Sequence, residues 1–182
     1  SGTCNPFYSD TLEIVVHPNP LADAGLDNGL CAGGTVNIGG SPSASGGTAP
    51  YTYTWTPSTG LSAANVANPD AGPTVTTTYT LLVVDTNGCS STDSTIVTAN
   101  ASPVANAGAD MTIACGDSTQ LAGAATGGAS PYTFSWTPST DLSNAAIANP
   151  WASPSGLTAY ALTVTDSNGC VGSDTFSITV SG

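Results

Sequence analysis

YTYTWTPSTGLS, residues Tyr51–Ser62, returns as YTFSWTPSTDLS at Tyr132–Ser143, with each residue 81 positions after its counterpart. The same offset relates Asn87-Gly88-Cys89 to Asn168-Gly169-Cys170. Self-similarity at a fixed period is the sequence signature of a repeated structural unit. The chain is therefore predicted to contain two copies of one module.

The first eighteen residues look like the end of a further copy. Their alternating apolar residues match the last predicted strand of the second copy in order, Leu12, Ile14 and Val16 with Phe176, Ile178 and Val180. We therefore expect residues 1–18 to be the terminal strand of a preceding, truncated or neighbouring module. Complete modules are expected at residues 19–101 and 102–182.

The charge composition limits the partners of this chain. Among 182 residues there is no Lys or Arg, against twelve Asp and Glu, which gives a formal net charge of −12. Without cations the surface cannot neutralise phosphates, so nucleic acid is not expected as a partner and anionic membranes are poor partners. No apolar run approaches the length of a membrane span, so direct membrane insertion is not expected either.

The five cysteines occupy repeated places. Cys31 and Cys89 of the first copy correspond to Cys115 and Cys170 of the second, and Cys4 corresponds to the second cysteine of each pair. The spacings do not fit a zinc site. We therefore predict one disulfide within each module, with Cys4 bonded to a partner outside this segment. Closing such a loop contributes about 4 kcal/mol in the chain-entropy model, and disulfides indicate an oxidising, extracellular location.

Strand periodicity dominates both copies. Tyr160, Leu162 and Val164 alternate with smaller or hydroxylated residues, and the Asn-Gly pairs at 87 and 168 are typical of tight hairpins. Short strands punctuated by 21 Gly and 13 Pro predict an all-β sandwich with Greek-key connections.

Two aromatic positions recur in the predicted core. Trp55 and Trp136 are expected at inward-facing positions of the third strand of each module, and Tyr79 and Tyr160 at the start of the next-to-last strand. Because both pairs are repeated at inward-facing positions, packing in the core is favoured over a role as ligand platforms.

Three motifs carry a resemblance to a known family. They are PVANAGAD at Pro103–Asp110, the strand Tyr132–Trp136 with Pro138, and YALTVTDSNGC at Tyr160–Cys170. The chain resembles the immunoglobulin-like and PKD-like repeats of large secreted adhesins and gliding-motility-associated proteins of Bacteroidota-type bacteria. The resemblance implies tandem immunoglobulin-like (PKD-like) β-sandwiches in a cell-surface stalk or adhesin, sometimes glycosylated. The complete lack of Lys and Arg departs from what is expected of the family.

Residues suited to catalysis are scarce. The only histidine, His17, lies in a proline-bounded linker, so a Ser-His-Asp or Cys-His arrangement lacks its parts. We therefore predict no enzymatic activity and no required cofactor.

Acidic and amide side chains suggest calcium as a possible exception. With immunoglobulin topology, the start of the first strand and the final hairpin of each module would share one pole. The predicted oxygen ligands are Asp23, Asp27 and Asp85 in the first module and Asn106, Asp110 and Asp166 in the second. The alternative is that Asp85 and Asp166 bind backbone amides in their own turns. Both interpretations stay open at the level of sequence.

Surface positions suggest two kinds of glycan contact. Four sites resemble the Asp-Ser/Thr-apolar acceptor pattern of bacterial O-glycosylation, with acceptors Thr11, Ser94, Ser118 and Thr175. Trp151, which stands where the first copy has Asp70, is a candidate contact to a sugar or protein partner, or packs locally over a loop.

These patterns predict a structural function. The chain is expected to be a disulfide-stapled spacer in a long extracellular fibre or cell-surface adhesin, with neighbouring repeats or identical subunits as partners. One alternative is a filament subunit that polymerises by adding its N-terminal strand to a neighbour. A second alternative is a glycan-binding adhesive module.

Overall fold

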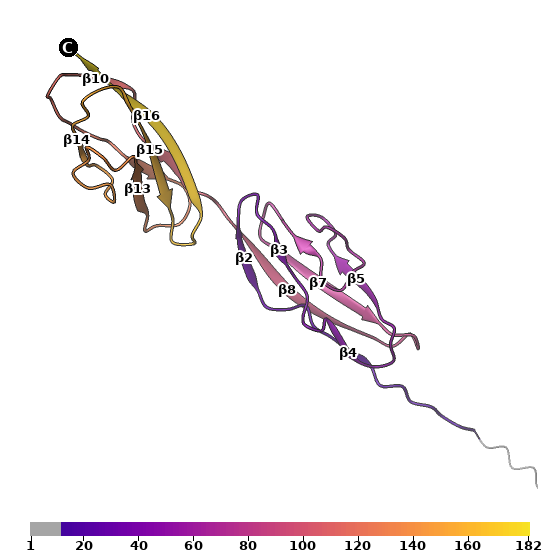
Figure 1. Cartoon of the computed structure of the whole chain (residues 1–182). Helices are drawn as coiled ribbons and strands as arrows, with labels where there is room; N and C mark the ends of the chain where they lie inside the picture. Colours follow the sequence, from indigo (N-terminus) through magenta and orange to yellow (C-terminus); the bar gives the residue numbers. More distant parts are fainter. Residues whose placement is uncertain (1–11) are drawn as a thin grey trace, which may run out of the picture.

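The computed structural model describes residues 12–182, and all regular secondary structure in that range is β-strand (Figure 1). No helix in that range is long and apolar enough to cross a membrane. Residues 1–11 lie outside the described part, and with them the predictions for Cys4 and Thr11. Residues 12–19 precede the first strand.

Module 1, which we define as residues 20–100, contains eight strands. They are β1 (Pro20–Ala22), β2 (Asn28–Cys31), β3 (Val36–Asn37), β4 (Ala44–Gly46), β5 (Thr52–Thr56), β6 (Asp70–Ala71), β7 (Thr77–Val84) and β8 (Ser90–Asn100). One sheet has the order β2-β8-β7-β5, and the facing strands pair as β1-β4 and β3-β6.

Module 2, residues 104–181, repeats this arrangement strand for strand. Its strands are β9 (Val104–Asn106), β10 (Met111–Ala114), β11 (Thr119–Gln120), β12 (Ala124–Thr126), β13 (Thr133–Thr137), β14 (Trp151–Ala152), β15 (Thr158–Thr165) and β16 (Val171–Ser181). The sheet β10-β16-β15-β13 faces the pairs β9-β12 and β11-β14. The predicted fold class, tandem immunoglobulin-like β-sandwiches, is confirmed.

Each four-stranded sheet contains one parallel pair. β2 runs parallel to β8 with Cys31 opposite Asn100, and β10 runs parallel to β16 with Ala114 opposite Ser181. The remaining neighbours in both sheets are antiparallel. Because β2 and β8 share a direction, both end at the same pole of module 1.

The repeated aromatic residues lie in the two cores, as predicted. Trp55 and Trp136 are each 2% exposed, and their indole N–H groups donate to the carbonyls of Val66 and Ile147 at 3.0 and 3.1 Å. Tyr79 and Tyr160 are fully buried beside them. A buried indole that keeps a hydrogen-bond partner contributes apolar area without leaving its donor unsatisfied.

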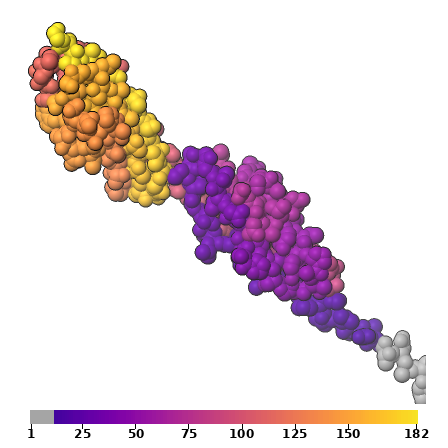
Figure 2. All heavy atoms as spheres, viewed as in Figure 1, coloured from indigo at the N-terminus to yellow at the C-terminus, as the bar shows by residue number. Residues whose placement is uncertain are grey.

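The modules lie end to end, with residue 12 and the C-terminus at opposite ends of an elongated molecule (Figures 1 and 2). β8 leads through residues 101–103 directly into β9. The last hairpin of module 2, between β15 and β16, consequently meets the pole of module 1 at which β2 and β8 end.

Candidate functional site at the junction between the modules

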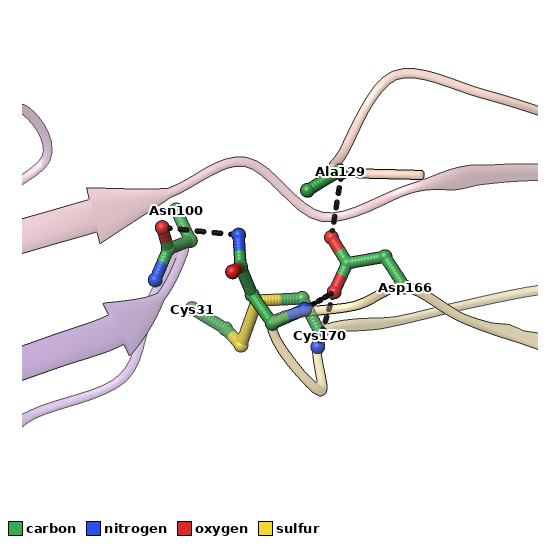
Figure 3. The surroundings of a disulfide bond; sticks show 6 residues. Cys31, Asn100, Ala129, Asp166 and Cys170 are labelled. Carbon is green, nitrogen blue, oxygen red and sulfur yellow. Dashed lines mark hydrogen bonds between the residues drawn. A yellow bond between two sulfur atoms is a disulfide. The ribbon is translucent and has the colours of Figure 1, made fainter. Parts of the chain in front are cut away.

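The junction is built around the hairpin that connects β15 to β16. The Asp166 carboxylate accepts the backbone N–H groups of Asn168 and Cys170 at 2.9 Å through Oδ1, and that of Ala129 at 3.0 Å through Oδ2 (Figure 3). Asp166 and Cys170 also close the turn with a backbone bond of 2.9 Å. One buried carboxylate therefore fixes the position of Cys170.

These bonds alter the acidity of Asp166. The hydrogen bond from Ala129 lowers the pKa of this carboxyl, burial opposes that effect, and the bonds from Cys170 and Asn168 lower it further. The result is a pKa below the ordinary value, because hydrogen bonds from amides favour the charged form. The hairpin is thus organised around an ionised side chain at neutral pH.

The covalent link at the junction joins the two modules. Cys31, at the end of β2, is bonded to Cys170, and the two residues are 139 positions apart in sequence (Figure 3). Cys170 is completely buried. The disulfide therefore locks the C-terminal pole of module 1 to the N-terminal pole of module 2.

The predicted disulfides within modules, Cys31–Cys89 and Cys115–Cys170, are wrong. Cys89 directly precedes β8 and Cys31 lies beside its last residue, so the eleven residues of β8 separate them. A strand of that length spans about 36 Å, whereas bridged Cα atoms lie within about 7 Å of each other. The length of β16 separates Cys115 from Cys170 in the same way.

Two further contacts fix the linker against module 2. The side-chain amide of Asn168 donates to the side-chain oxygen of Asn100 at 3.2 Å. Gly172 lies so close to the linker that a Cβ there would overlap the carbonyl oxygen of Pro103. Glycine at this position lets the linker backbone approach β16 closely.

The opposite pole of module 1 carries a second copy of the hairpin. Asp85 accepts the N–H groups of Asn87, Cys89 and Thr48, each at 2.9 Å. Burial raises the pKa of Asp85, but the bonds from Thr48, Cys89 and Asn87, together with the nearby His17, outweigh it and leave the pKa below the ordinary value. The hairpin that presents Cys89 thus has the same internal bonding as the hairpin that presents Cys170.

The surroundings of Cys89 match the junction in one more respect. The side-chain amide of Asn87 lies 3.1 Å from His17 Nδ1, as that of Asn168 lies near Asn100. The Cys89 sulfur, which is half-buried and not bonded to another described cysteine, lies 4.0 Å from the carbonyl oxygen of His17. His17 therefore occupies at this pole the place that Asn100 occupies at the junction.

Cys115 lies at the far pole of module 2. It is exposed, has no disulfide partner among the described residues, and its N–H donates to Ser181 at 2.9 Å. In the parallel ladder Ala114, not Cys115, matches Cys31. Cys115 thus stands one residue later in the turn than Cys31 does.

The residues proposed as calcium ligands in module 1 lie at different points of the sandwich. Asp23 accepts the N–H of Gly25, Asp27 accepts that of Ile96 in β8, and Asp85 is occupied by its own hairpin. The parallel pairing of β2 places Asp27 beside the middle of β8, away from the hairpin at its start.

The corresponding residues in module 2 repeat this separation. Asn106 accepts the N–H of Gly108, Asp110 accepts that of Ser177, and Asp166 is bound in its hairpin. Within residues 12–182 no three acidic, His or Cys side chains form a group able to hold a metal ion. Asp85 and Asp166 accept backbone amides of their own turns, which is the alternative to calcium binding raised from the sequence. Calcium binding stays a prediction.

The predicted surface sites are accessible. Ser94, Ser118 and Thr175 are exposed, and Trp151, in β14, is 53% exposed with its backbone N–H bonded to the Ser143 hydroxyl. Glycosylation and a sugar or protein contact at Trp151 stay predictions, the latter to be tested by comparing wild type and Trp151→Ala on a glycan array.

No protein family model and no curated protein matches the sequence. Among solved structures, the chain is similar to the I-band fragment I67–I69 from titin, at 15% identity and a TM-score of 0.48, covering 92% of this chain and 66% of that one. It is also similar to Sidekick-1 immunoglobulin domains 1–4, at 11% identity and a TM-score of 0.45, covering 90% of this chain and 49% of that one.

The first two immunoglobulin domains of DIP-gamma are a third similar structure. They are 11% identical with a TM-score of 0.40, and the match covers 91% of this chain and 99% of that one.

The strand order, the parallel β2-β8 and β10-β16 pairs and the cross-module disulfide together define the chain as a pair of immunoglobulin-like sandwiches joined covalently end to end.

Proposed function

We propose that this chain is a spacer segment of an extracellular fibre or cell-surface adhesin, in which disulfides hold consecutive modules in line. The observation that carries the proposal is the Cys31–Cys170 bond across the junction. A bond within a module would stabilise that module alone, whereas this bond limits bending between modules. Resistance to bending is a mechanical property, and a spacer requires it.

Composition and chemistry support the same proposal. A structural disulfide is typical of oxidising, extracellular environments, and the absence of Lys and Arg removes every cleavage site for proteases that cut after basic residues. The motifs shared with secreted Bacteroidota-type repeats suggest a bacterial surface protein without enzymatic activity.

The proposal is tested by freeing the junction. Wild type is compared with Cys31→Ser/Cys170→Ser by small-angle X-ray scattering, and Cys89→Ser/Cys115→Ser is the matched control that leaves the junction disulfide intact. We expect wild type and control to give the same narrow distribution of maximum dimensions. The junction variant should keep its β circular dichroism but give a broader distribution shifted to shorter dimensions. An unchanged distribution would contradict a stiffening role for the bond.

A second candidate function is a filament subunit that adds its N-terminal strand to a neighbour. It is favoured by Leu12, Ile14 and Val16, which are 85%, 77% and 83% exposed although their alternation is that of a buried strand. Electron microscopy of native material separates the two functions. A spacer array gives beads on a string, and strand addition gives an ordered filament with a subunit-defined repeat.

A further inference from the structure

The two hairpins that present Cys89 and Cys170 differ mainly in whether the sulfur has a partner among residues 12–182. Each is organised by one aspartate that accepts three backbone N–H groups at 2.9 to 3.0 Å. In each, the asparagine of the Asn-Gly turn contacts a side chain that precedes the module, Asn100 at the end of β8 for one and His17 for the other. The N-terminal pole of module 1 is thus built like one half of the junction.

The segment before module 1 has the pattern of the strand that supplies the other half. By order of apolar residues, Ile14 corresponds to Val97 in β8 and Ile178 in β16, both completely buried, yet Ile14 is 77% exposed. By the same order, His17 corresponds to Asn100. Residues 12–17 therefore present the side chains of a last strand without the sandwich that would cover them.

Parallel pairing fixes where a partner cysteine would stand. In module 1 Cys31 is opposite Asn100, and the next N–H, that of Ala32, donates to the Asn100 carbonyl at 3.1 Å. A strand paired in the same way with residues 12–17 would place its final residue opposite His17. The sulfur of Cys89 already lies 4.0 Å from the His17 carbonyl.

We propose that Cys89 forms a second inter-module disulfide, with a cysteine on a like module that residues 12–17 complete as its last strand. The partner cysteine ends the strand parallel to this segment, as Cys31 ends β2. Two thiols form one S–S bond and release two protons and two electrons to a disulfide oxidant, which is reduced to two thiols. The inference names the partner of the proposed spacer and so rests on that function.

A second copy of the chain docked through Cys115 fits less well. At the far pole the place of Asn100 is taken by Ser181 of β16, which already completes module 2. Docking a second copy there would bring its His17 into the position that Ser181 holds. Cys115 is also one residue out of register with Cys31. The occupant we infer is therefore a sandwich that lacks its own last strand.

The test supplies that sandwich by fusion. Residues 19–87 are joined in front of Gly2 of the full chain, so that the added body lacks β8 and the natural N-terminal segment can complete it. Cys4, the original Cys31 and Cys170 are changed to Ser, leaving the added copy of Cys31 with Cys89 and Cys115. The matched control also carries Ser at the added Cys31.

The fusion is oxidised with a glutathione redox pair, and its remaining thiols are blocked with a thiol reagent. It is then digested with pepsin, which does not require basic residues for cleavage. The low pH of this digestion suppresses disulfide exchange, because exchange requires a thiolate. Mass spectrometry is expected to find the added Cys31 linked to Cys89, with Cys115 carrying the blocking group. In the control, which lacks the added Cys31, Cys89 should carry the blocking group. A blocked Cys89 in a fusion whose added body is folded, or a Cys89–Cys115 link, overturns the proposal.

Native material tests the same inter-module disulfide without a fusion protein. Non-reducing peptide mapping should find Cys89 linked to a cysteine outside residues 12–182 and other than Cys4. Cys89 recovered as a thiol, or linked to Cys4 or Cys115, overturns the inference. If Cys89 is unlinked while the scattering experiment still shows a junction stiffened by Cys31–Cys170, the spacer function stands and only this inference fails.

Discussion

The two buried tyrosines, Tyr79 and Tyr160, stand in equivalent places but have different partners. The Tyr79 hydroxyl donates to the Thr59 carbonyl at 2.8 Å, whereas the Tyr160 hydroxyl is buried and has no partner among the described residues. The turn beside Tyr79 contains Gly60 with a φ of 79°, and a Cβ there would lie 3.0 Å from the Tyr79 hydroxyl. Module 2 has Asp141 at this position with a φ of 63°. The module with Asp141 in place of glycine is thus the one in which the tyrosine hydroxyl lacks its hydrogen bond to the turn.

Replacing Asp141 with glycine should therefore stabilise module 2. The change removes a non-glycine residue from the left-handed region and opens space for the Tyr160 hydroxyl to reach the turn. We expect a gain of about 1 kcal/mol in the free energy of unfolding, the usual net value of one hydrogen bond. Urea denaturation followed by Trp fluorescence measures it, and Gly60→Asp is the reciprocal variant, expected to destabilise module 1. Loss of stability in Asp141→Gly would contradict this explanation.

The hairpin aspartates predict a loss of stability in acid. The pKa of Asp85 and that of Asp166 are both lowered from the ordinary value of 3.8 in the folded protein. The folded state therefore binds these protons less readily than the unfolded state. The stabilisation is complete only well above the ordinary value of 3.8 and is lost as pH falls through the lowered folded-state values.

Melting temperatures between pH 7 and pH 2 measure this dependence. Wild type should melt at a constant temperature well above pH 4 and at decreasing temperatures below it. Asp166→Asn should melt lower than wild type at pH 7, because an amide cannot accept at both oxygen positions, and should lose less on acidification. Identical slopes for both proteins would show that Asp166 does not carry the acid sensitivity.

At the scale of elements, β8 and β16 occupy the same place but complete different cores. In β16, Phe176 is buried against Trp136 in an edge-on contact at 5.9 Å and against Tyr160 in a stacked one at 6.0 Å. The equivalent residue of β8 is Thr95, which is fully buried and donates its hydroxyl to Leu26 at 2.8 Å. One strand therefore contributes aromatic packing where the other contributes a hydrogen bond.

This difference predicts unequal costs for two matched substitutions. Phe176→Ala should destabilise module 2 by about 3–5 kcal/mol, the usual range for a buried Phe. Thr95→Ala should destabilise module 1 by about 0.5–1.5 kcal/mol, the usual net value of one hydrogen bond, because the side-chain amide of Asn28 still donates to the Leu26 carbonyl at 2.7 Å. Chemical denaturation of both variants measures the costs. Equal losses would mean that the aromatic contacts of Phe176 add little to its core.

Strand by strand, the sequence predicts what depends on local pattern. The alternation at Tyr160, Leu162 and Val164 places all three in the core of module 2, as the structure confirms, and both Asn-Gly pairs lie in hairpins. The parallel pairing of β2 with β8 could not be predicted from local pattern. β2 has only four residues, and each pairs with a residue 69 positions later in the sequence. That pairing decides which pole each cysteine occupies.

The cysteine pairing at the junction depends on the same long-range contact. The repeated order of the cysteines in the sequence says nothing about the end of the sandwich at which each lies. The available signal was the length of the last strand between Cys89 and Asn100, which separates Cys89 from any residue near the end of that strand. In combination with the parallel neighbour, that length excludes a bond within the module.

At the scale of the whole molecule, the absence of Lys and Arg makes nearly every interaction between charged side chains repulsive. The net charge is −12, and the carboxylates described above have backbone amides, not cations, as partners. Repulsion among exposed charges weakens as the screening length falls from about 30 Å at 0.01 M salt to about 3 Å at 1 M. The folded protein should therefore become more stable as salt is added, because compact states suffer most from self-repulsion.

The melting temperature should rise by several degrees between about 10 mM and 500 mM NaCl, where the screening length shortens most. A decrease would mean that attractive charge pairs dominate after all. The same series, repeated with CaCl2 and MgCl2 at matched ionic strength, separates screening from specific binding. Screening alone would shift the melting temperature equally with calcium and magnesium, as the separate contacts of Asp23, Asp27 and Asp85 favour. A larger rise with calcium alone, abolished by Asp27→Asn or Asp110→Asn, would instead establish the calcium site that the acidic pattern suggested.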